Sequence, residues 1–300
     1  MANPVPLDVG RLRLLREVGL RGSIAAAARA LGLTASAVSQ QLTLLERETG
    51  TPLLERSSRG VRLTGAGDAL AARAAQVLEV LGSARADLDR LSGAVSGPVS
   101  LASVASAAAT VVSDAVADLR DTRPEIVVSL VSAEPERGLG LLLSGDVDLA
   151  VVDEYDYVPL ALPEGAVVRD LGAEPLVLVR PSGARPRRVP ALRDLADATW
   201  VMPPEDAACG RAVRAACRTA GFEPRVAWQT DDMLLLVRAV ADGHGIAVLP
   251  RRSVAVDAAA VDVGVLTDPR LHRRLRVVAR AHAAARPAVA AVVDSLVARC

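Results

Sequence analysis

The sequence contains no lysine, so its 35 basic residues are all arginine, and they are matched by 35 acidic residues. A net charge of zero gives no support to a polycation that would bind nucleic acid or an anionic membrane along its whole length. The charge is unevenly distributed, however, since residues 1–65 hold nine arginines against five acidic residues, a net charge of +4. We therefore expect any attraction for polyanions at the N-terminal end.

Cysteine is also scarce, and the three residues Cys209, Cys217 and Cys300 are an odd number. Together with the absence of a positively charged, apolar leader, this favours a reducing cytoplasm over an export pathway. The cysteines and histidines have no spacing typical of a metal site, so we expect neither a metal nor a cofactor. No apolar run reaches the roughly 18 residues of a membrane span. The sequence therefore predicts a cytoplasmic protein with no membrane partner.

Aromatic residues make up only 2% of the chain, whereas hydrophobic residues make up 51%. The cores must therefore be built mainly from alanine, valine and leucine. A chain of 300 residues exceeds one ordinary compact domain, so we expect at least two. A nucleophile elbow, a phosphate-binding loop and a dinucleotide fingerprint are all missing from the sequence, so we expect no enzyme and no catalytic residues.

The stretch from Ser23 to Thr64 is typical of a helix-turn-helix followed by a short hairpin. Ser23 is a suitable N-cap for a helix over residues 24–30, which is nearly all alanine and lets another helix cross it closely. Gly32 can adopt the positive φ that the turn requires, and Thr34 can cap the next helix. This arrangement is typical of proteins that read DNA.

The helix that starts after Thr34 has one apolar and one polar face. Val38, Leu42 and Leu45 follow at i, i+4 and i+7 and predict a buried stripe. The opposite face is small and uncharged at its N-terminal end, which suits the major groove, and a glutamine there can pair bidentately with adenine. The alternative is a polar face that is merely solvated. The residues expected to face DNA are Thr34, Ala35, Ser36, Ser39 and Gln40.

Two short apolar runs after Gly50 flank a Ser-Ser-Arg-Gly tip, which predicts a hairpin that forms the wing of a winged helix. Arg56, Arg59 and Arg62 are placed on this hairpin to meet phosphates or a narrow minor groove. The alternative for one of the three is an ordinary surface salt bridge.

From Thr64 the sequence predicts a long helix that ends in a flexible connector over residues 92–98. Apolar residues alternate along this helix at intervals of four and three, which is the a/d pattern of a coiled coil. Such a seam has no partner within a small winged helix and therefore indicates a second copy of the chain. The alternative is a core helix packed within one chain. The seam residues are Leu70, Ala74, Val77, Leu81, Ala84, Leu88 and Leu91.

The rest of the chain alternates strand-like and helix-like segments. Strands at 99–104, 126–131 and 147–152 are separated by helices at 107–119 and 137–143, which predicts a parallel sheet. After a break near residues 160–165 a second set of segments follows, and the last strand and helix come after a further break at residues 268–269. Two α/β lobes joined by two crossing segments would leave a cleft between them. The second set comprises strands at 167–171, 176–179, 200–202, 226–228 and 246–249 with helices at 209–220 and 233–241, before a strand at 275–281 and a helix at 288–298.

Short motifs occur along the chain in the order of a known family. On them the sequence resembles the LysR-type transcriptional regulators, with a specific match over the helix-turn-helix and hairpin and a looser one beyond. Leu54 departs from the pattern, because phenylalanine is common at that position. The motifs include Ser36-Ala37-Val38-Ser39, Pro52-Leu53-Leu54-Glu55-Arg56, Gly60-Val61-Arg62-Leu63-Thr64, Gly145-Asp146-Val147-Asp148 and Gly243-His244-Gly245-Ile246.

The resemblance implies an α/β protein that binds double-stranded promoter DNA as a homodimer or homotetramer, acts with RNA polymerase and responds to a small-molecule effector. The alternative is a constitutive DNA-binding regulator whose C-terminal domain only oligomerises. The implied domains are a winged helix-turn-helix at 1–65, a linker and dimerisation helix at 66–96, and an effector-binding domain at 97–300 that is similar to periplasmic binding proteins. Within the last domain, lobe I covers about 97–163 and 268–300, and lobe II covers about 164–267.

The resemblance also bears on single residues. Gln40 matches a variable position, as a base reader should, whereas Gln41 matches a nearly fixed one and is assigned to phosphate or intramolecular bonding. By analogy, effector contacts are expected at strand ends and in the loops beside them, where the alternative for any one residue is a plain helix cap. Glu134 and Asp231 would disfavour a simple dicarboxylate unless arginines pair with them. The candidate effector contacts are Ser103, Ser106, Ser132, Glu134, Met202, Pro203 and Asp231.

Peroxide-sensing members of this family carry two redox cysteines in a broadly similar region, and residues 217–221 resemble one of those contexts. Cys209 and Cys217 are eight residues apart on one predicted helix, so they lie about 12 Å apart along its axis, beyond the reach of a disulfide. A small buried apolar role is therefore the favoured interpretation of both.

Overall fold

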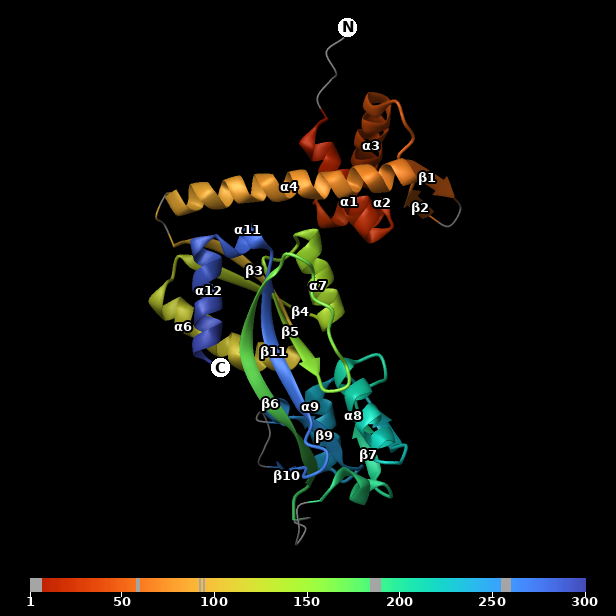
Figure 1. The fold of residues 1–300 in the computed structure, drawn as a ribbon, viewed down its shortest axis with the longest axis vertical. Coiled ribbons are helices and arrows are strands. Elements are labelled where there is room, and N and C mark those ends of the chain that lie inside the picture. The colour runs from red at the N-terminus through yellow and green to blue at the C-terminus, as the bar shows by residue number, and fades with distance from the viewer. Residues whose placement is uncertain (1–6, 58–59, 92, 94, 184–189, 255–259) are drawn as a thin grey trace. The chain divides into compact units, whose positions relative to one another are not determined.

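The computed structural model describes residues 7–57, 60–91, 93, 95–183, 190–254 and 260–300. The chain forms two compact units, one made of residues 1–94 with 144–146 and the other of residues 95–143 and 147–300. Figure 1 shows both units and labels many of their helices and strands. Among the described residues, no helix is long and apolar enough to cross a membrane.

The first unit is a three-helix domain with a hairpin and a long helix. Each of the three short helices begins at a residue whose side chain accepts a backbone hydrogen bond, namely Asp8 from Arg11 N, Ser23 from Ala26 N and Thr34 from Ala37 N. Such caps fix helix starts locally, and two of them, Ser23 and Thr34, are the caps that the sequence predicts. The elements are α1 (Val9–Arg21), α2 (Ile24–Ala30), α3 (Ala35–Thr49), β1 (Leu54–Ser57), β2 (Gly60–Leu63) and α4 (Gly65–Leu91).

The core of this unit joins the predicted apolar stripe of α3 to the other helices and the hairpin. Val38, Leu42 and Leu45 are buried there. Glu46 fastens α3 to the hairpin, since its Oε1 accepts hydrogen bonds from Leu53 N at 2.8 Å and from Leu54 N at 3.1 Å. These contacts hold α3 and the hairpin in one rigid arrangement.

Lobe I of the second unit is built on a sheet in which β3 lies between β4 and β5 and is parallel to both. This is the predicted parallel arrangement. The strand β11 is antiparallel to β5 and to the first part of β6. The strands are β3 (Gly97–Ser103), β4 (Ile126–Ser132), β5 (Leu149–Tyr155), β6 (Val167–Pro181) and β11 (His272–Ala279), and the helices are α5 (Ala105–Ala107), η1 (Ala108–Val112), α6 (Ser113–Thr122), α7 (Pro135–Ser144), α11 (Ala281–Ala284) and α12 (Pro287–Ala298).

Lobe II is built around the second part of β6, which pairs with β9 and β10. A parallel pair, β7 and β8, completes its strands, and α8 and α9 cover separate buried clusters. The elements are η2 (Leu192–Leu195), β7 (Thr199–Met202), α8 (Ala208–Thr219), β8 (Arg225–Gln229), α9 (Met233–Ala241), β9 (Ala247–Pro250), α10 (Arg251–Val254) and β10 (Val261–Val265).

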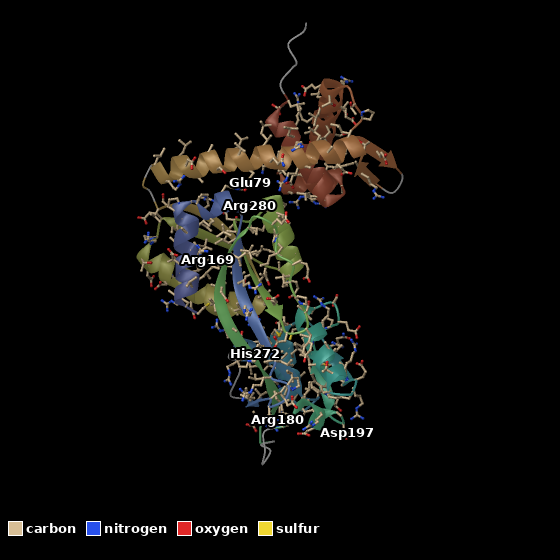
Figure 2. The ribbon with its side chains drawn as sticks, in the orientation of Figure 1. Glu79, Arg169, Arg180, Asp197, His272 and Arg280 are labelled. Atoms are coloured by element: carbon tan, nitrogen blue, oxygen red, sulfur yellow. The ribbon has the colours of Figure 1, made fainter. Side chains whose placement is uncertain are left out.

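The long strand β6 differs from the expectation of two separate strands in lobe II. Its first residues, from Val167, pair with β11 in lobe I, and Leu171 lies in the lobe I core. Its last residues pair with β9 and β10, so one continuous strand crosses between the lobes. Arg169 and Arg180 mark its two ends in Figure 2. The break at residues 160–165 therefore precedes the crossing, and residues 167–171 belong to lobe I.

A second difference concerns the helix after β3. It begins at Ala105 and continues to Thr122, with a π-helical segment, η1, inside it. The sequence predicted only residues 107–119. A π segment is typical of functional sites, because the extra residue re-aims side chains around it. This one lies at the edge of the cavity described below.

Candidate functional site

The outward face of α3 forms an open groove of small polar residues. Ser36 and Gln40 are exposed and Ser39 is half-buried, while the opposite face of the helix lies in the core. Thr34 caps the helix, and its hydroxyl also lies 3.0 Å from the Ser36 hydroxyl. The first residue of the helix, Ala35, is exposed. The residues that line the groove are Ser36, Ser39, Gln40, Thr43, Leu44 and Arg47.

Gln41 differs from its neighbour Gln40, because it is half-buried and bonded within the domain. Its Oε1 accepts a hydrogen bond from Arg11 Nε at 2.9 Å, and Arg11 also pairs with Glu48. The Gln41 amide thus links α1 to α3. The family resemblance assigns Gln41 to phosphate bonding or to intramolecular bonding, and the structure contains an intramolecular bond.

The hairpin has the predicted strands, with Glu55 opposite Arg62 and Arg56 opposite Val61. Arg62 is exposed. For Arg56 the structure describes the strand but not the side chain, and Arg59 lies outside the described residues.

The predicted seam on α4 divides into two parts. Leu70 packs against the core of the N-terminal unit, and Ala74 is fully buried. These two residues are therefore used within the chain, contrary to the expectation that they face a partner. The later positions remain uncovered, with Leu81 48%, Leu88 63% and Leu91 84% exposed, and Val77 and Ala84 are exposed as well.

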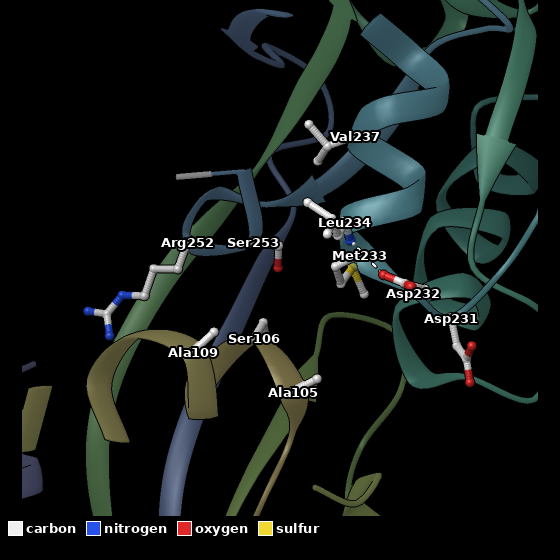
Figure 3. A pocket seen from close by; sticks show the side chains of 10 residues that line it. All are labelled: Ala105, Ser106, Ala109, Asp231, Asp232, Met233, Leu234, Val237, Arg252 and Ser253. Atoms are coloured by element: carbon white, nitrogen blue, oxygen red, sulfur yellow. Dashed lines mark hydrogen bonds between the residues drawn. The ribbon is translucent and has the colours of Figure 1, made fainter. Parts of the chain in front are cut away.

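A cavity lies between the two lobes of the second unit, where α5 and η1 face α9 and α10. We call it the interlobe pocket. Its larger chamber has a volume of about 320 Å³, and a narrow annex of about 30 Å³ shares the lining residues Ala105, Ser106, Asp231 and Met233 with it. Figure 3 shows the chamber, with Ser106 and Ala109 on one side and Ser253 and Leu234 on the other.

Four of the predicted effector contacts line the interlobe pocket, namely Ser106, Glu134, Pro203 and Asp231. Ser103 and Met202 instead lie in the protein interior. Ser103 is the last residue of β3 and its hydroxyl donates to Val104 O at 3.0 Å, while the Met202 side chain packs in the lobe II core. Strand alternation accounts for both, since the final residue of a strand can point to either face of the sheet. Ser132 is exposed and does not line the pocket.

A buried charge network under the pocket was missed by the sequence interpretation. Arg273 on β11 donates to Ser106 Oγ at 2.5 Å, to Asp153 Oδ2 at 3.1 Å and to Glu174 Oε1 at 2.8 Å. Tyr155 donates its hydroxyl to the same Asp153 oxygen at 2.9 Å. These bonds connect the start of α5 to the strands β5, β6 and β11.

The strand pattern of β11 contained a signal for this network. Arg273 alternates with Leu275 and Val277, which are buried, while His272 and Arg274 are exposed. An arginine on the buried side of a strand requires acidic partners, because an unpaired charge is very costly in the interior. Asp153 and Glu174 could not be identified as those partners without the pairing of β11 with β5 and β6.

The electrostatics of the pocket are dominated by carboxylates. The pKa of Glu134 is raised to about 6, chiefly because neighbouring atoms displace water around it and also because Asp153, Glu136 and Asp231 are nearby, with Arg211 acting in the opposite direction. Its side chain nevertheless remains accessible at the mouth. Burial also raises the pKa of Asp153, although Arg273 opposes that effect.

Cys209 and Cys217 are both buried on α8, and all three cysteines are free thiols. Burial is the first cause that raises the pKa of each of these two thiols to about 12. Cys209 lines the annex, whereas Cys217 is a core residue of lobe II. A protonated thiol is a poor nucleophile, so neither environment activates its cysteine.

Comparisons with known proteins match both units. A family model described as "Bacterial regulatory helix-turn-helix protein, lysR family" matches residues 9–68, and one described as "LysR substrate binding domain" matches residues 92–300. The chain is 30% identical over 245 residues to a probable HTH-type transcriptional regulator, LrrA, of Synechococcus elongatus, covering 82% of this chain and 81% of that protein. It is 31% identical over 288 residues to a probable hydrogen peroxide-inducible genes activator of Streptomyces viridosporus, covering 92% and 89%.

Solved structures show the same fold at lower identity. A full-length OxyR variant from Pseudomonas aeruginosa superposes with a TM-score of 0.74 at 18% identity, covering 97% of this chain and 95% of that one. Full-length CbnR in complex with its target DNA superposes with a TM-score of 0.56 at 23% identity, covering 96% and 98%.

Proposed function

Because the chain belongs to the LysR family of bacterial transcriptional regulators, we propose that it binds promoter DNA as a homo-oligomer and that a small molecule in the interlobe pocket controls this binding. The observation that carries the proposal is the outward face of α3, which is small, polar and uncovered on a rigid domain. The relatives reported above are named as transcriptional regulators or gene activators rather than enzymes.

The proposed reading of DNA uses α3 for sequence and the hairpin for the backbone. Gln40 is exposed toward the groove, where a carboxamide can donate to and accept from adenine. Ser36 and Ser39 are small enough to let the helix enter closely. Arg62 on the hairpin, with Arg56 and Arg59 as predicted from the sequence, would meet phosphates or the minor groove and so position the helix.

The proposed oligomer uses the uncovered part of the α4 seam. Val77, Leu81 and Leu88 would pack against the same residues of a second copy, which removes apolar side chains from water. Two linked winged helices hold two half-sites, so each gains from the effective concentration that the other provides. The family resemblance predicts that the oligomer is a homodimer or a homotetramer. It also predicts a contact with RNA polymerase.

The proposed control site is the interlobe pocket, because both lobes contribute to its walls. Ala105 and Ser106 come from lobe I, while Met233 and Ser253 come from lobe II. A ligand that touches both walls favours one separation of the lobes over others, and only such a difference in affinity can shift a conformational equilibrium. The alternative is a constitutive regulator whose second unit only oligomerises.

Footprinting on the promoter beside the gene, with a broad metabolite panel, tests this function. We expect a protected, partly palindromic site whose extent or DNA bending changes with at least one compound. An unchanged footprint and an unchanged melting temperature across the panel would favour the constitutive alternative. Failure to protect any site would remove the DNA-binding proposal itself.

A further inference from the structure

The larger chamber of the interlobe pocket has mainly apolar walls. Ala105 and Ala109 lie on the lobe I side, and Met233, Leu234 and Val237 of α9 lie on the lobe II side (Figure 3). Its volume of about 320 Å³ is in the range of small-molecule sites. The chamber therefore suits a ligand that has an apolar body.

The annex adds two exposed carboxylates. Glu134 and Asp231 both line it, and the charges that act on Glu134 are three carboxylates, Asp153, Glu136 and Asp231, against one cation, Arg211. A third carboxylate, Asp153, lies at the base of the annex, but it is already paired with Arg273. The charge that remains for a ligand to neutralise is negative.

Two of the three arginines near the pocket, Arg273 and Arg211, are paired with carboxylates. The Arg273 side chain is fully buried and pairs with Asp153 and Glu174, so it presents no surface to a ligand. Arg211 Nη2 lies 3.1 Å from Glu136 Oε1. Arg252 lines the chamber with its stem, and Figure 3 shows its guanidinium pointing away from the other labelled residues. Of these three arginines, only Arg252 is not paired with a described carboxylate, and its guanidinium is turned away from the chamber.

A second, independent feature of the chamber indicates a ligand. Ser253 is only 7% exposed, and its hydroxyl has no hydrogen-bond partner among the described residues. Figure 3 shows this hydroxyl pointing into the chamber toward Ser106. Buried hydroxyls are normally hydrogen-bonded, so a polar group on a bound molecule would supply the missing partner.

Two helix starts at the pocket favour an anion, that of α8 and that of the helix beginning at Ala105. Ala207 precedes the first and Val104 the second, neither has a capping side-chain hydrogen bond, and both residues line the annex. Each helix start is equivalent to about half a positive charge, whereas Glu134 and Asp231 bring two negative charges when both are ionised. The α9 start is already neutralised, because Asp232 accepts hydrogen bonds from Leu234 N and Leu235 N. The balance at the annex is negative.

We infer that the effector is an amphipathic cation, with an apolar body in the chamber, an ammonium-type end at Glu134 and Asp231, and a polar group within reach of Ser253. This inference rests on the proposed function and adds the chemical class of the ligand. A dicarboxylate or an aromatic acid is disfavoured by the same contacts.

Matched pairs of probes that share one apolar body and differ in the charged end test the inference in the full-length protein. Hexylamine is compared with heptanoate, and phenethylamine with 3-phenylpropanoate, by titration calorimetry at pH 7.5. We expect each amine to bind at least about tenfold more tightly than its matched acid, a ratio that corresponds to 1.4 kcal/mol. The variants Glu134→Gln and Asp231→Asn should each reduce the amine preference, whereas Glu164→Gln, a change at an exposed carboxylate outside the pocket, should not.

The pH dependence gives a further readout. Lowering the pH to 5.5 protonates Glu134, whose pKa lies at about 6 in the company of Asp153, Glu136, Asp231 and Arg211. Amine binding should therefore weaken from pH 7.5 to pH 5.5 in the wild type, and this change should be smaller in Glu134→Gln.

Three results would overturn the inference. They are tighter binding of the acids, equal binding that Glu134→Gln does not alter, and no binding of either class at millimolar concentration. The first leaves the proposed function standing, because the pocket would still take a small molecule. The promoter footprint with the metabolite panel tests the proposed function separately.

Discussion

At the scale of single residues, side chains that are adjacent in the sequence lie in different environments. Gln40 is uncovered on the groove of α3, whereas the adjacent Gln41 is bonded to Arg11 inside the domain. The same division occurs on β11, where Arg273 is buried among carboxylates and Arg274 is exposed. Substitutions at these neighbours should therefore have different consequences, and each pair supplies its own control.

Gln40→Ala should weaken DNA binding at particular base pairs by about 1–3 kcal/mol, because it removes the proposed bidentate base contact. Arg62→Ala should instead weaken binding to all sequences and reduce the slope of log affinity against log salt concentration by about one, because it removes the proposed phosphate contact. Affinity measurements on single-base operator variants at several salt concentrations separate the two effects. An equal loss on every sequence for Gln40→Ala would remove its role as a base reader.

Arg273→Met should reduce the free energy of unfolding by about 3–5 kcal/mol, because it leaves Asp153 and Glu174 buried without their cation. Arg274→Met, at the exposed neighbour, should change it by less than about 0.5 kcal/mol. Urea titrations of both variants measure the difference. Similar stabilities for the two would show that the buried network contributes little.

Cys209 and Cys217 should resist alkylation at pH 8, because burial raises the pKa of each to about 12 and leaves only about one thiol in ten thousand ionised. Cys300 is exposed and should react. Mass spectrometry after iodoacetamide or dilute peroxide treatment reads each site in one sample. Rapid modification of Cys209 or Cys217 would instead support a redox role for that cysteine.

At the scale of elements, the sequence predicts well where local chemistry decides the structure. The caps Ser23 and Thr34 define α2 and α3, and the helix at Met233–Ala241 starts after Asp232, which caps it. Elements that depend on pairing across the chain were harder to predict. The continuity of β6 between lobes follows from its pairing with β11, β9 and β10, which single-strand periodicity does not contain.

The candidate site shows the same limit. Glu134 and Asp231 could be proposed because they stand at the ends of predicted elements, and both line the pocket. Ser253 and Arg252 were not proposed, because they lie on a short helix, α10, that has no distinctive pattern of its own. Their place opposite Ala109 depends on how lobe II packs against lobe I.

The α4 seam gives the prediction at the element scale. Leu81→Asp should abolish the dimer and weaken operator binding by about a hundredfold, through loss of the avidity that two linked domains provide. Leu81 is 48% exposed within one chain, so the change should leave the fold of the monomer intact. Analytical ultracentrifugation and circular dichroism check both points. A stable dimer of this variant would remove the coiled-coil role of the seam.

At the scale of the whole molecule, the net charge is zero, but the charges are unevenly distributed along the chain. Residues 1–65 carry a net charge of +4, which attracts DNA without making the entire chain adhere to it. A domain with a net charge of +4 can neutralise few phosphates, so we expect firm binding to require a second copy together with base recognition. Specific binding by the oligomer is therefore the central claim.

The most direct test compares the dissociation constant of the full-length protein for the promoter beside its gene with that for a scrambled duplex of equal length, at one physiological salt concentration. We predict a ratio of at least about a thousandfold in favour of the promoter, the lower end for specific DNA-binding proteins. Equal affinity for the two duplexes would contradict the account.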